Sequence, residues 1–324
     1  MNVPAEKNPR ESSGLKNAVQ QQLDQNYHSV LIEKVRAAGF FMRAGRLEIH
    51  LAKEFGFCYG VERAVQYAYE TRARFPERRI FLTNEIIHNP RVNAELQRMG
   101  VKILTGHASW SEISEKDVVI MPAFGVPVEA LREFQGKGCV IVDTTCGSVM
   151  SVWRRVESYS HDGFTSVIHG KYDHEETRAT CSRAAKYLVV KDREQVEQVC
   201  RYITGNGKPH GAASPRETFL EKFRNACSFG FDPERDLARI GFANQTTMLS
   251  RESIEISELL RAALQSRYGG AEVGGRFRHF DTICSATQDR QDAIRELGER
   301  QMAVILVIGG RSEEHTSELQ SLTD

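Results

Sequence analysis

Short apolar runs alternate with amphipathic segments along the chain from about residue 46 onward. The amphipathic segments repeat their apolar residues with the period of an α-helix, whereas the short runs between them are apolar almost throughout. In residues 61–75 the apolar side chains share one helical face, formed by Val61, Ala64, Val65, Ala68 and Tyr69. Strands and helices that alternate in this way predict an α/β fold with parallel sheets and helices on both faces.

The same pattern gives approximate bounds for the elements. The predicted strands occupy residues 46–52, 78–84, 101–104, 117–124, 139–145, 165–170, 186–190, 239–246 and 302–310. The predicted helices occupy residues 61–75, 90–100, 128–138, 148–159, 193–203, 250–269 and 288–300. The first 45 residues are polar, with one helix-like stretch near residues 27–38, and residues 205–214 have the composition of a loop.

Composition and charge exclude several classes of protein. The 43 basic and 43 acidic residues balance, which gives no support for nucleic-acid or membrane binding. No apolar run reaches the length of about 18 residues that a membrane span needs, and the N-terminus lacks the apolar part of a secretory signal. Seven cysteines without a CxxC pair argue against a zinc finger and indicate a reducing compartment. We therefore expect a cytoplasmic protein; the family resemblance described below implies a bacterial one.

Three cysteines, Cys58, Cys146 and Cys284, each follow a strand-like run and precede a helix-like one. Two of them share the motif Asp-Thr-x-Cys, at residues 143–146 and 281–284. Thiols presented from three strand ends can converge on one soft metal centre, and an iron–sulfur cluster held by three cysteines keeps one iron free for chemistry. The alternative for each cysteine alone is a small buried hydrophobe. We assign that structural role to the others, Cys139, Cys181, Cys200 and Cys227.

Polar residues suited to proton or phosphate chemistry follow several predicted strands. His88 precedes a helix start at Asn89, and His174 follows another strand; histidines in such loops can bind phosphate oxygens or act as acids. The carboxylates directly after His174 can carry protons. Hydroxyls near Thr246 can position a substrate or a water. The plainer alternatives are surface loop histidines and helix N-caps.

Six segments occur in order along the chain: GFCYGVERAV, NEIIHNPRV, VDTTCGSV, HGKYDHEET, ANQTTML and DTICSATQDRQ. Together they resemble the LytB/IspH family of 4-hydroxy-3-methylbut-2-enyl diphosphate reductases, over about residues 27–310. The plastid and cyanobacterial branch is the most similar, because it also has an N-terminal extension and an insertion before ANQTTML. One segment alone is a weak signal, whereas six in order are specific.

The resemblance implies an organisation into three small α/β domains, with mostly parallel sheets and flanking helices, around a central iron–sulfur cluster. The expected parts are an N-terminal extension (1–45), a first domain (46–145), a second domain (146–281) with an insertion near 204–237, and the start of a third domain (282–310).

The implied cofactor is a [4Fe–4S] cluster with Cys58, Cys146 and Cys284 as its three protein ligands and one open iron. The implied reaction removes the hydroxyl of an allylic diphosphate with two electrons and two protons. Its products are isopentenyl and dimethylallyl diphosphate, formed in the last step of the non-mevalonate (MEP) isoprenoid pathway. No GxGxxG motif follows a predicted strand, so we expect ferredoxin or flavodoxin as the electron donor.

The resemblance also implies roles for single residues. Glu176 matches the acid that delivers protons to the leaving hydroxyl, and Thr246 matches the threonine near that hydroxyl. His88 and His174 match the histidines that line the diphosphate pocket. Phe124 stands where a further family histidine is found, and the plastid-like branch shares this phenylalanine.

The C-terminus departs from the family pattern. After Gly309-Gly310 the family has Asn-Ser-Ser-Asn, which grips the diphosphate, whereas this chain places Glu313 and Glu314 at the serine positions. Carboxylates facing a diphosphate repel it. We interpret residues 311–324 as a non-native tail and the third domain as incomplete. Two alternatives to an active reductase stay open: an iron–sulfur-binding protein without catalysis, and an inactive truncated form.

Overall fold

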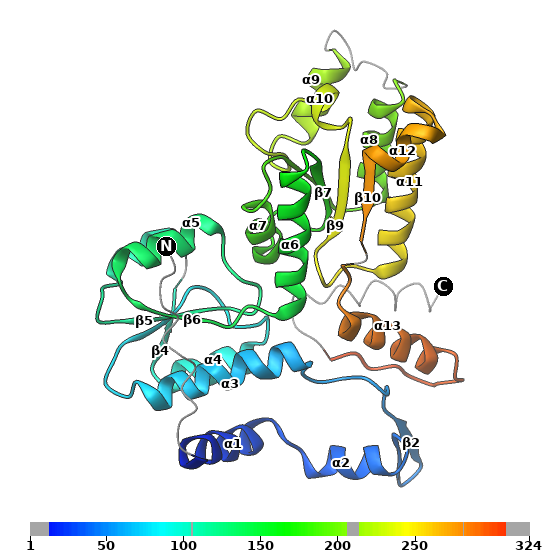
Figure 1. Cartoon of the computed structure of the whole chain (residues 1–324). Helices are drawn as coiled ribbons and strands as arrows, with labels where there is room; N and C mark the ends of the chain where they lie inside the picture. Colours follow the sequence, from blue (N-terminus) through cyan, green and yellow to red (C-terminus); the bar gives the residue numbers. More distant parts are fainter. Residues whose placement is uncertain (1–12, 105, 206–213, 281, 309–324) are drawn as a thin grey trace. The chain divides into compact units, whose positions relative to one another are not determined.

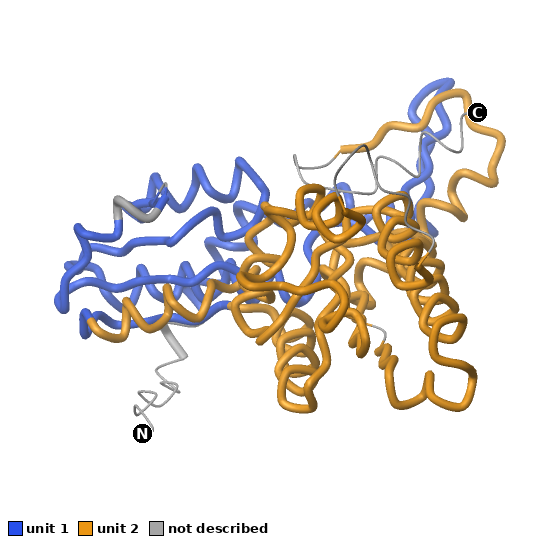
Figure 2. The backbone as a smooth tube through the Cα atoms, turned by 90° about the horizontal axis from the view of Figure 1, so that it is seen from above, with its two compact units in different colours: residues 1–123, 137–144 blue, residues 124–136, 145–324 orange. Residues whose placement is uncertain are grey.

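The computed structural model describes residues 13–104, 106–205, 214–280 and 282–308. The chain divides into two compact units, residues 1–123 with 137–144 and residues 124–136 with 145–324 (Figure 2). Among the described residues, no helix is both long and apolar enough to cross a membrane. The predicted tail lies outside the described residues, and the predicted domain boundaries stay predictions.

The first unit is built around a parallel sheet. Its elements are α1 (Ser13–Tyr27), α2 (Val30–Ala37), β1 (Phe41–Ala44), β2 (Leu47–His50), α3 (Tyr59–Arg74), β3 (Ile80–Leu82), α4 (Pro90–Arg98), β4 (Val101–Ile103), the 3₁₀ helix η1 (His107–Glu112), β5 (Val118–Met121) and β6 (Val140–Asp143). The sheet has the order β4-β3-β5-β6 with all pairs parallel. Every residue of β3 and β5 is buried, as expected for strands covered on both faces. Strands β1 and β2 form a separate antiparallel hairpin.

The second unit contains another parallel sheet. Its elements are α5 (Val128–Lys137), whose end reaches the unit boundary, α6 (Gly147–His161), β7 (Thr165–His169), α7 (Glu175–Cys181), β8 (Tyr187–Val190), α8 (Arg193–Ile203), α9 (Pro215–Lys222), α10 (Pro233–Asp236), β9 (Ile240–Asn244), α11 (Ser250–Tyr268), α12 (Gly270–Arg276), β10 (Phe277–His279) and α13 (Ser285–Gly298). The sheet has the order β10-β9-β7-β8, again with parallel pairs. Helices α6 and α7 cover one face, and α8, α11 and α12 cover the other (Figure 1).

Neighbouring residues of the second sheet point into different parts of the core. Val167 and Phe242 pack with residues of α8, α11 and α12. Ile168 packs with α7, and Ala243 packs with α6. Because successive side chains of a strand point to opposite faces, a sheet covered by helices on both faces needs apolar residues at almost every position. This requirement explains the short uninterrupted apolar runs in the sequence.

The two sheets have the same connectivity. In each sheet the second strand pairs on one side of the first, the third strand pairs on the other side, and the fourth lies beyond the third. The direction of the connections therefore changes between β3 and β5, and again between β7 and β9. In open parallel sheets such a switch point leaves a crevice at the carboxyl ends of the strands, where ligands bind.

The predicted α/β class is confirmed, and most predicted elements are present. Each helix predicted between residues 61 and 300 has a counterpart, as does each strand predicted between residues 46 and 246, although most of the strands are shorter than predicted. The pattern missed the 15-residue α1, which lies in the polar N-terminal segment. The other missed elements are short: β1, β10, η1, α7, α9, α10 and α12. They contain too few residues for a hydrophobic period to be recognised.

The predicted strand at residues 302–310 is wrong for its described part, because residues 302–308 form no strand. Val304, Leu306 and Ile308 are 80%, 80% and 87% exposed. A strand is stabilised by hydrogen bonds to a neighbouring strand, and an apolar sequence alone cannot supply that neighbour. No strand among the described residues pairs with this segment.

Candidate active site

The switch point of the second sheet brings Glu176 and Thr246 together. The loop after β7 leads to Glu176 in the first turn of α7, and the loop after β9 contains Thr246. The Thr246 backbone N–H donates a hydrogen bond to Glu176 Oε1 (2.6 Å), and the Thr246 hydroxyl donates to Oε2 (2.8 Å). One residue, 70 positions away in the sequence, therefore holds both carboxylate oxygens.

Burial makes Glu176 a weaker acid than an exposed glutamate. The residue is 1% exposed, and burial raises its pKa from 4.5 to about 7, although the two hydrogen bonds from Thr246 act in the opposite direction. A carboxyl group with a pKa near neutral is populated in both protonation states at physiological pH. Glu176 is therefore suited to hold a proton and to release it to a reacting group.

His174 is the N-cap residue of α7 and is buried next to this acid. Its Nδ1 accepts a hydrogen bond from the Glu176 backbone N–H (3.1 Å), so a neutral ring carries its hydrogen on Nε2. The Phe124 ring meets the His174 ring edge-on, with centroids 5.6 Å apart. The phenylalanine at the position of a further family histidine thus packs against the histidine predicted to bind substrate.

A path of hydrogen bonds connects the acid to one of the predicted metal ligands. The Cys284 backbone N–H donates to the Thr246 carbonyl (3.3 Å). Thr246 in turn donates both of its hydrogen bonds to the Glu176 carboxylate. Cys284, Thr246 and Glu176 come from three separate loops, and this path fixes their relative positions.

The loops that carry Cys146 and Cys284 lie next to each other in the second unit. Ser148, two residues after Cys146, places its hydroxyl 3.5 Å from the Cys284 sulfur. Cys146 is the N-cap residue of α6, and Cys284 is the N-cap residue of α13. Both thiols are half-buried, and neither forms a disulfide. Metals bind the thiolate form of cysteine.

The threonine of each Asp-Thr-x-Cys motif anchors its loop to the adjacent third strand. The Thr282 hydroxyl donates to Asn244 Oδ1 (3.0 Å) and accepts a hydrogen bond from the Asn244 backbone N–H (2.9 Å). The Thr144 hydroxyl donates to the Met121 carbonyl at the end of β5 (2.6 Å). Both threonines are buried. Sequence reasoning missed them, although their repetition in the two motifs was the available signal.

The first unit carries two further residues of the predicted site. Cys58 is half-buried and is the N-cap residue of α3. His88 lies in the loop after β3, beside the N-cap residue Asn89 of α4, and its Nδ1 is 3.1 Å from Glu85 Oε2. The metal-binding role of Cys58 and the substrate-binding role of His88 stay predictions.

The other four cysteines favour the neutral thiol over the thiolate. Burial raises the pKa of the Cys139 and Cys227 thiols, and it raises the pKa of Cys181 and Cys200 to about 12. A metal binds the thiolate, and a raised pKa disfavours that form. This result supports the structural role that the sequence indicated for them.

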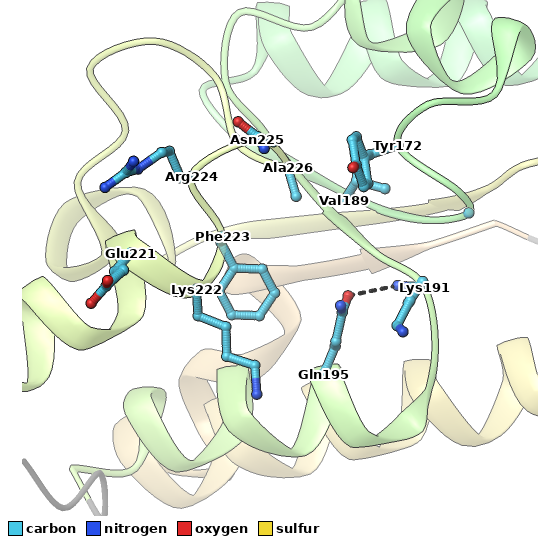
Figure 3. Close-up of a pocket in the computed structure, with 11 residues that line it drawn as sticks. Tyr172, Val189, Lys191, Gln195, Glu221, Lys222, Phe223, Arg224, Asn225 and Ala226 are labelled. Atoms are coloured by element: carbon cyan, nitrogen blue, oxygen red, sulfur yellow. Dashed lines mark hydrogen bonds between the residues drawn. The ribbon is translucent and has the colours of Figure 1, made fainter. Parts of the chain in front are cut away.

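A separate pocket of about 480 Å³ lies at the carboxyl end of β8 (Figure 3). Gly170 and Tyr172 line it from the β7–α7 loop, and residues 221–226 line it from the predicted insertion. On its wall the Lys191 backbone N–H donates to Gln195 Oε1 (2.9 Å; Figure 3). The pocket contains none of the predicted site residues, so the hydrogen-bonded path from Glu176 to Cys284 is the candidate active site.

The fold and this site define a doubly wound α/β protein that presents a buried carboxyl group and cysteine loops from its strand ends. The family model described as "LytB protein" matches residues 49–324, and the chain belongs to this family.

Curated relatives cover nearly all of the chain. It is 48% identical over 321 residues to a 4-hydroxy-3-methylbut-2-enyl diphosphate reductase of Synechococcus sp.. The aligned region covers 98% of this chain and 77% of the Synechococcus protein. A reductase of the same name from Gloeobacter violaceus is 47% identical over 320 residues, and the aligned region covers 97% of this chain and 75% of that protein.

Solved structures of reductases agree with the fold. One, of (E)-4-hydroxy-3-methyl-but-2-enyl diphosphate reductase, has a TM-score of 0.53 at 24% identity and covers 84% of this chain and 80% of its own. A second, from Plasmodium falciparum, has a TM-score of 0.60 at 19% identity. The match covers 83% of this chain and 70% of the Plasmodium chain.

Proposed function

We propose that this chain is a 4-hydroxy-3-methylbut-2-enyl diphosphate reductase of the non-mevalonate isoprenoid pathway. The reaction breaks the allylic carbon–oxygen bond of the substrate, consumes two electrons and two protons, and releases water with isopentenyl or dimethylallyl diphosphate. The curated relatives carry this name over nearly the whole chain. The observation that carries the proposal is the buried Glu176, held by Thr246, which is itself hydrogen-bonded to Cys284.

The proposed cofactor is a [4Fe–4S] cluster bound by Cys58, Cys146 and Cys284. Soft thiolate ligands are the donors that such clusters use, and the adjacent loops of Cys146 and Cys284 fit this donor set. When bound, the cluster supplies electrons and a Lewis-acidic iron for the substrate oxygen.

The protein residues bind the substrate and move the proton. Glu176, with a pKa near neutral, protonates the departing hydroxyl, and the Thr246 hydroxyl orients both the acid and the substrate oxygen. His174 offers Nε2–H to the diphosphate, because its Nδ1 is occupied by the Glu176 N–H. His88 contributes a second donor to the same anion. Burial of Glu176 keeps water from competing for its proton.

The electrons come from an external low-potential donor, for which ferredoxin or flavodoxin is the proposed class. The substrate is a small allylic diphosphate.

The test is anaerobic reconstitution of the full chain with iron and sulfide, followed by turnover of the allylic diphosphate with a chemical reductant. We expect iron bound in the ratio of one four-iron cluster per chain and formation of both diphosphate products. A protein that binds the cluster but leaves the substrate unchanged would instead be either the non-catalytic iron–sulfur protein or the inactive truncated form, and restoring a family-like C-terminus would rescue turnover only in the second case. A folded protein that binds no cluster would contradict the proposal altogether.

A further inference from the structure

A serine hydroxyl contacts the sulfur of one predicted cluster ligand. Ser148 Oγ lies 3.5 Å from Cys284 Sγ, although the two residues are 136 positions apart in the sequence. Ser148 belongs to the first turn of α6, directly after the first Asp-Thr-x-Cys motif, and Cys284 ends the second motif. The contact therefore links the two motif loops through a side chain that the family resemblance does not mark as functional.

Chemistry decides the direction of this hydrogen bond. A cysteine that ligates iron is a thiolate and has no hydrogen to donate, so the sulfur accepts and the Ser148 hydroxyl donates. A donor hydrogen beside the sulfur stabilises negative charge. Reduction adds negative charge to the cluster, so the hydrogen bond stabilises the reduced state more than the oxidised state. The contact is partly buried, so solvent screens it less than it would screen a contact at the surface.

Both partners of the contact are held in place. The Cys284 loop is fixed by the two hydrogen bonds between Thr282 and Asn244 and by the bond from Cys284 N–H to the Thr246 carbonyl. Ser148 is fixed by α6, whose Val152 and Val156 pack with Ala243 of the sheet and whose Val149 packs with Ala179 of α7. Because both the Cys284 loop and α6 are held in place, the Ser148 hydroxyl stays within hydrogen-bonding distance of the Cys284 sulfur.

We propose that Ser148 is a positioning residue that raises the reduction potential of the cluster by donating a hydrogen bond to the Cys284 thiolate. The inference rests on the proposed function, since it requires the cluster that this function uses. Its consequence is that a low-potential protein donor can reduce the cluster more readily than it could without the hydroxyl.

The experiment is a redox titration of the reconstituted full chain, with dithionite and mediators, followed by electron paramagnetic resonance. Three variants are compared with the wild type. Ser148→Ala removes the donor, Ser148→Thr retains a hydroxyl, and Ser151→Ala removes an exposed serine one turn further along the same helix. Iron content is measured on each sample, so that a change of potential is read only from fully loaded protein.

We expect Ser148→Ala to keep its iron and to have a more negative midpoint potential than the wild type. Ser148→Thr and Ser151→Ala should have the midpoint potential of the wild type. A wild-type potential in fully loaded Ser148→Ala overturns the inference and leaves the proposed function standing. Loss of iron in Ser148→Ala also overturns it, because the contact would then hold the loop rather than set the potential. A folded wild type without a cluster overturns the proposed function and this inference together.

Discussion

The two sheets of this chain share one connectivity but surround their acids differently. In each sheet the loop after the first strand carries a glutamate and a histidine: Glu85 and His88 after β3, and His174 and Glu176 after β7. The Glu85 side chain is 43% exposed and contacts His88, whereas Glu176 is 1% exposed and receives both of its carboxylate hydrogen bonds from the third-strand loop. The shared topology places an acid at each switch point, and burial gives Glu176 the raised pKa of a general acid.

The loops after the third strands explain part of this difference. The loop after β9 offers Thr246, whose N–H and hydroxyl both bind a carboxylate. The segment after β5 continues to Phe124, whose ring has no donor. Both sheets nevertheless use the same device for their cysteine loops, because Thr144 and Thr282 each bond to the end of a third strand. The two sheets therefore share the threonine that anchors a cysteine loop, but of the two loops after the third strands only the one after β9 has a threonine that binds a carboxylate.

Substitution of the predicted cysteine ligands should have the largest effect, the loss of the cluster. These variants also test whether both units supply ligands to it. Cys58→Ser in the first unit and Cys284→Ser in the second should each abolish the cluster, because each removes a thiolate ligand. Iron content and visible absorption after anaerobic reconstitution measure this loss. Cys139→Ser, at a buried thiol with a raised pKa, is the control and should retain full iron. Full iron in Cys58→Ser would confine the ligands to the second unit.

The next largest effect is on turnover, and it is measured by the same substitution at each of the two glutamates. Glu176→Gln should lower turnover by roughly a hundredfold or more, the size expected when a general acid is removed. Glu85→Gln should lower turnover far less, because this carboxylate is partly solvated and acts on the proposed reaction only through its contact with His88. Steady-state rates with a chemical reductant measure both variants, and iron content checks that each is loaded. Equal rates for the two variants would remove Glu176 from its proposed role.

Burial of Glu176 also predicts a pH dependence of stability. A carboxyl with a raised folded-state pKa binds its proton more tightly in the folded than in the unfolded chain. Its stabilising contribution is complete below about pH 4.5 and is lost as the pH rises through about 7. The change from 4.5 to about 7 corresponds to about 3 kcal/mol of unfolding free energy.

Urea unfolding of the cluster-free chain at several pH values measures this term as the difference between wild type and Glu176→Gln. The difference is needed because His169, whose pKa burial lowers to about 4, changes stability in the opposite direction over part of the same range. His169 is present in both proteins, so its contribution cancels. A difference that does not vary with pH would show that Glu176 is not buried in solution.

The smallest expected effects distinguish the two threonine anchors. Thr282→Val breaks two hydrogen bonds and leaves buried Asn244 groups unpaired, which should cost about 2–3 kcal/mol of unfolding free energy. Thr144→Val breaks one side-chain bond, while the Thr144 backbone N–H still donates to the Met121 carbonyl (3.2 Å), so about 1 kcal/mol is expected. Denaturant unfolding measures both.

Thr71→Val is the matched control for these anchors, because the buried Thr71 hydroxyl donates one bond to the Tyr67 carbonyl within α3, outside the two motif loops. It should resemble Thr144→Val in stability without changing the iron content. Equal costs for Thr282→Val and Thr144→Val would mean that the second bond of Thr282 contributes nothing.

Apart from α1, the long elements were predictable because their local pattern agrees with their burial. Helix α3 shows this well: Ala64, Val65, Ala68 and Tyr69 were assigned to one face, and all four are buried. The three-residue strands β3 and β4 were also predicted, whereas several short helices were not. Helix α7 begins within the polar segment HEET, and only packing against the sheet buries its Glu176. The segment 302–308 shows the reverse case, an apolar run that forms no strand.

The sequence by itself determined the α/β class, the strand ends at which the chemical residues lie, and the motifs that mark them, because these depend on local periodicity and residue type. Only the tertiary structure decided which of those residues meet. The bonds from Thr246 to Glu176, from Cys284 to Thr246 and from Ser148 to Cys284 join loops that are far apart in the sequence. The raised pKa of Glu176 likewise comes from surrounding side chains that bury it, and no local pattern encodes them.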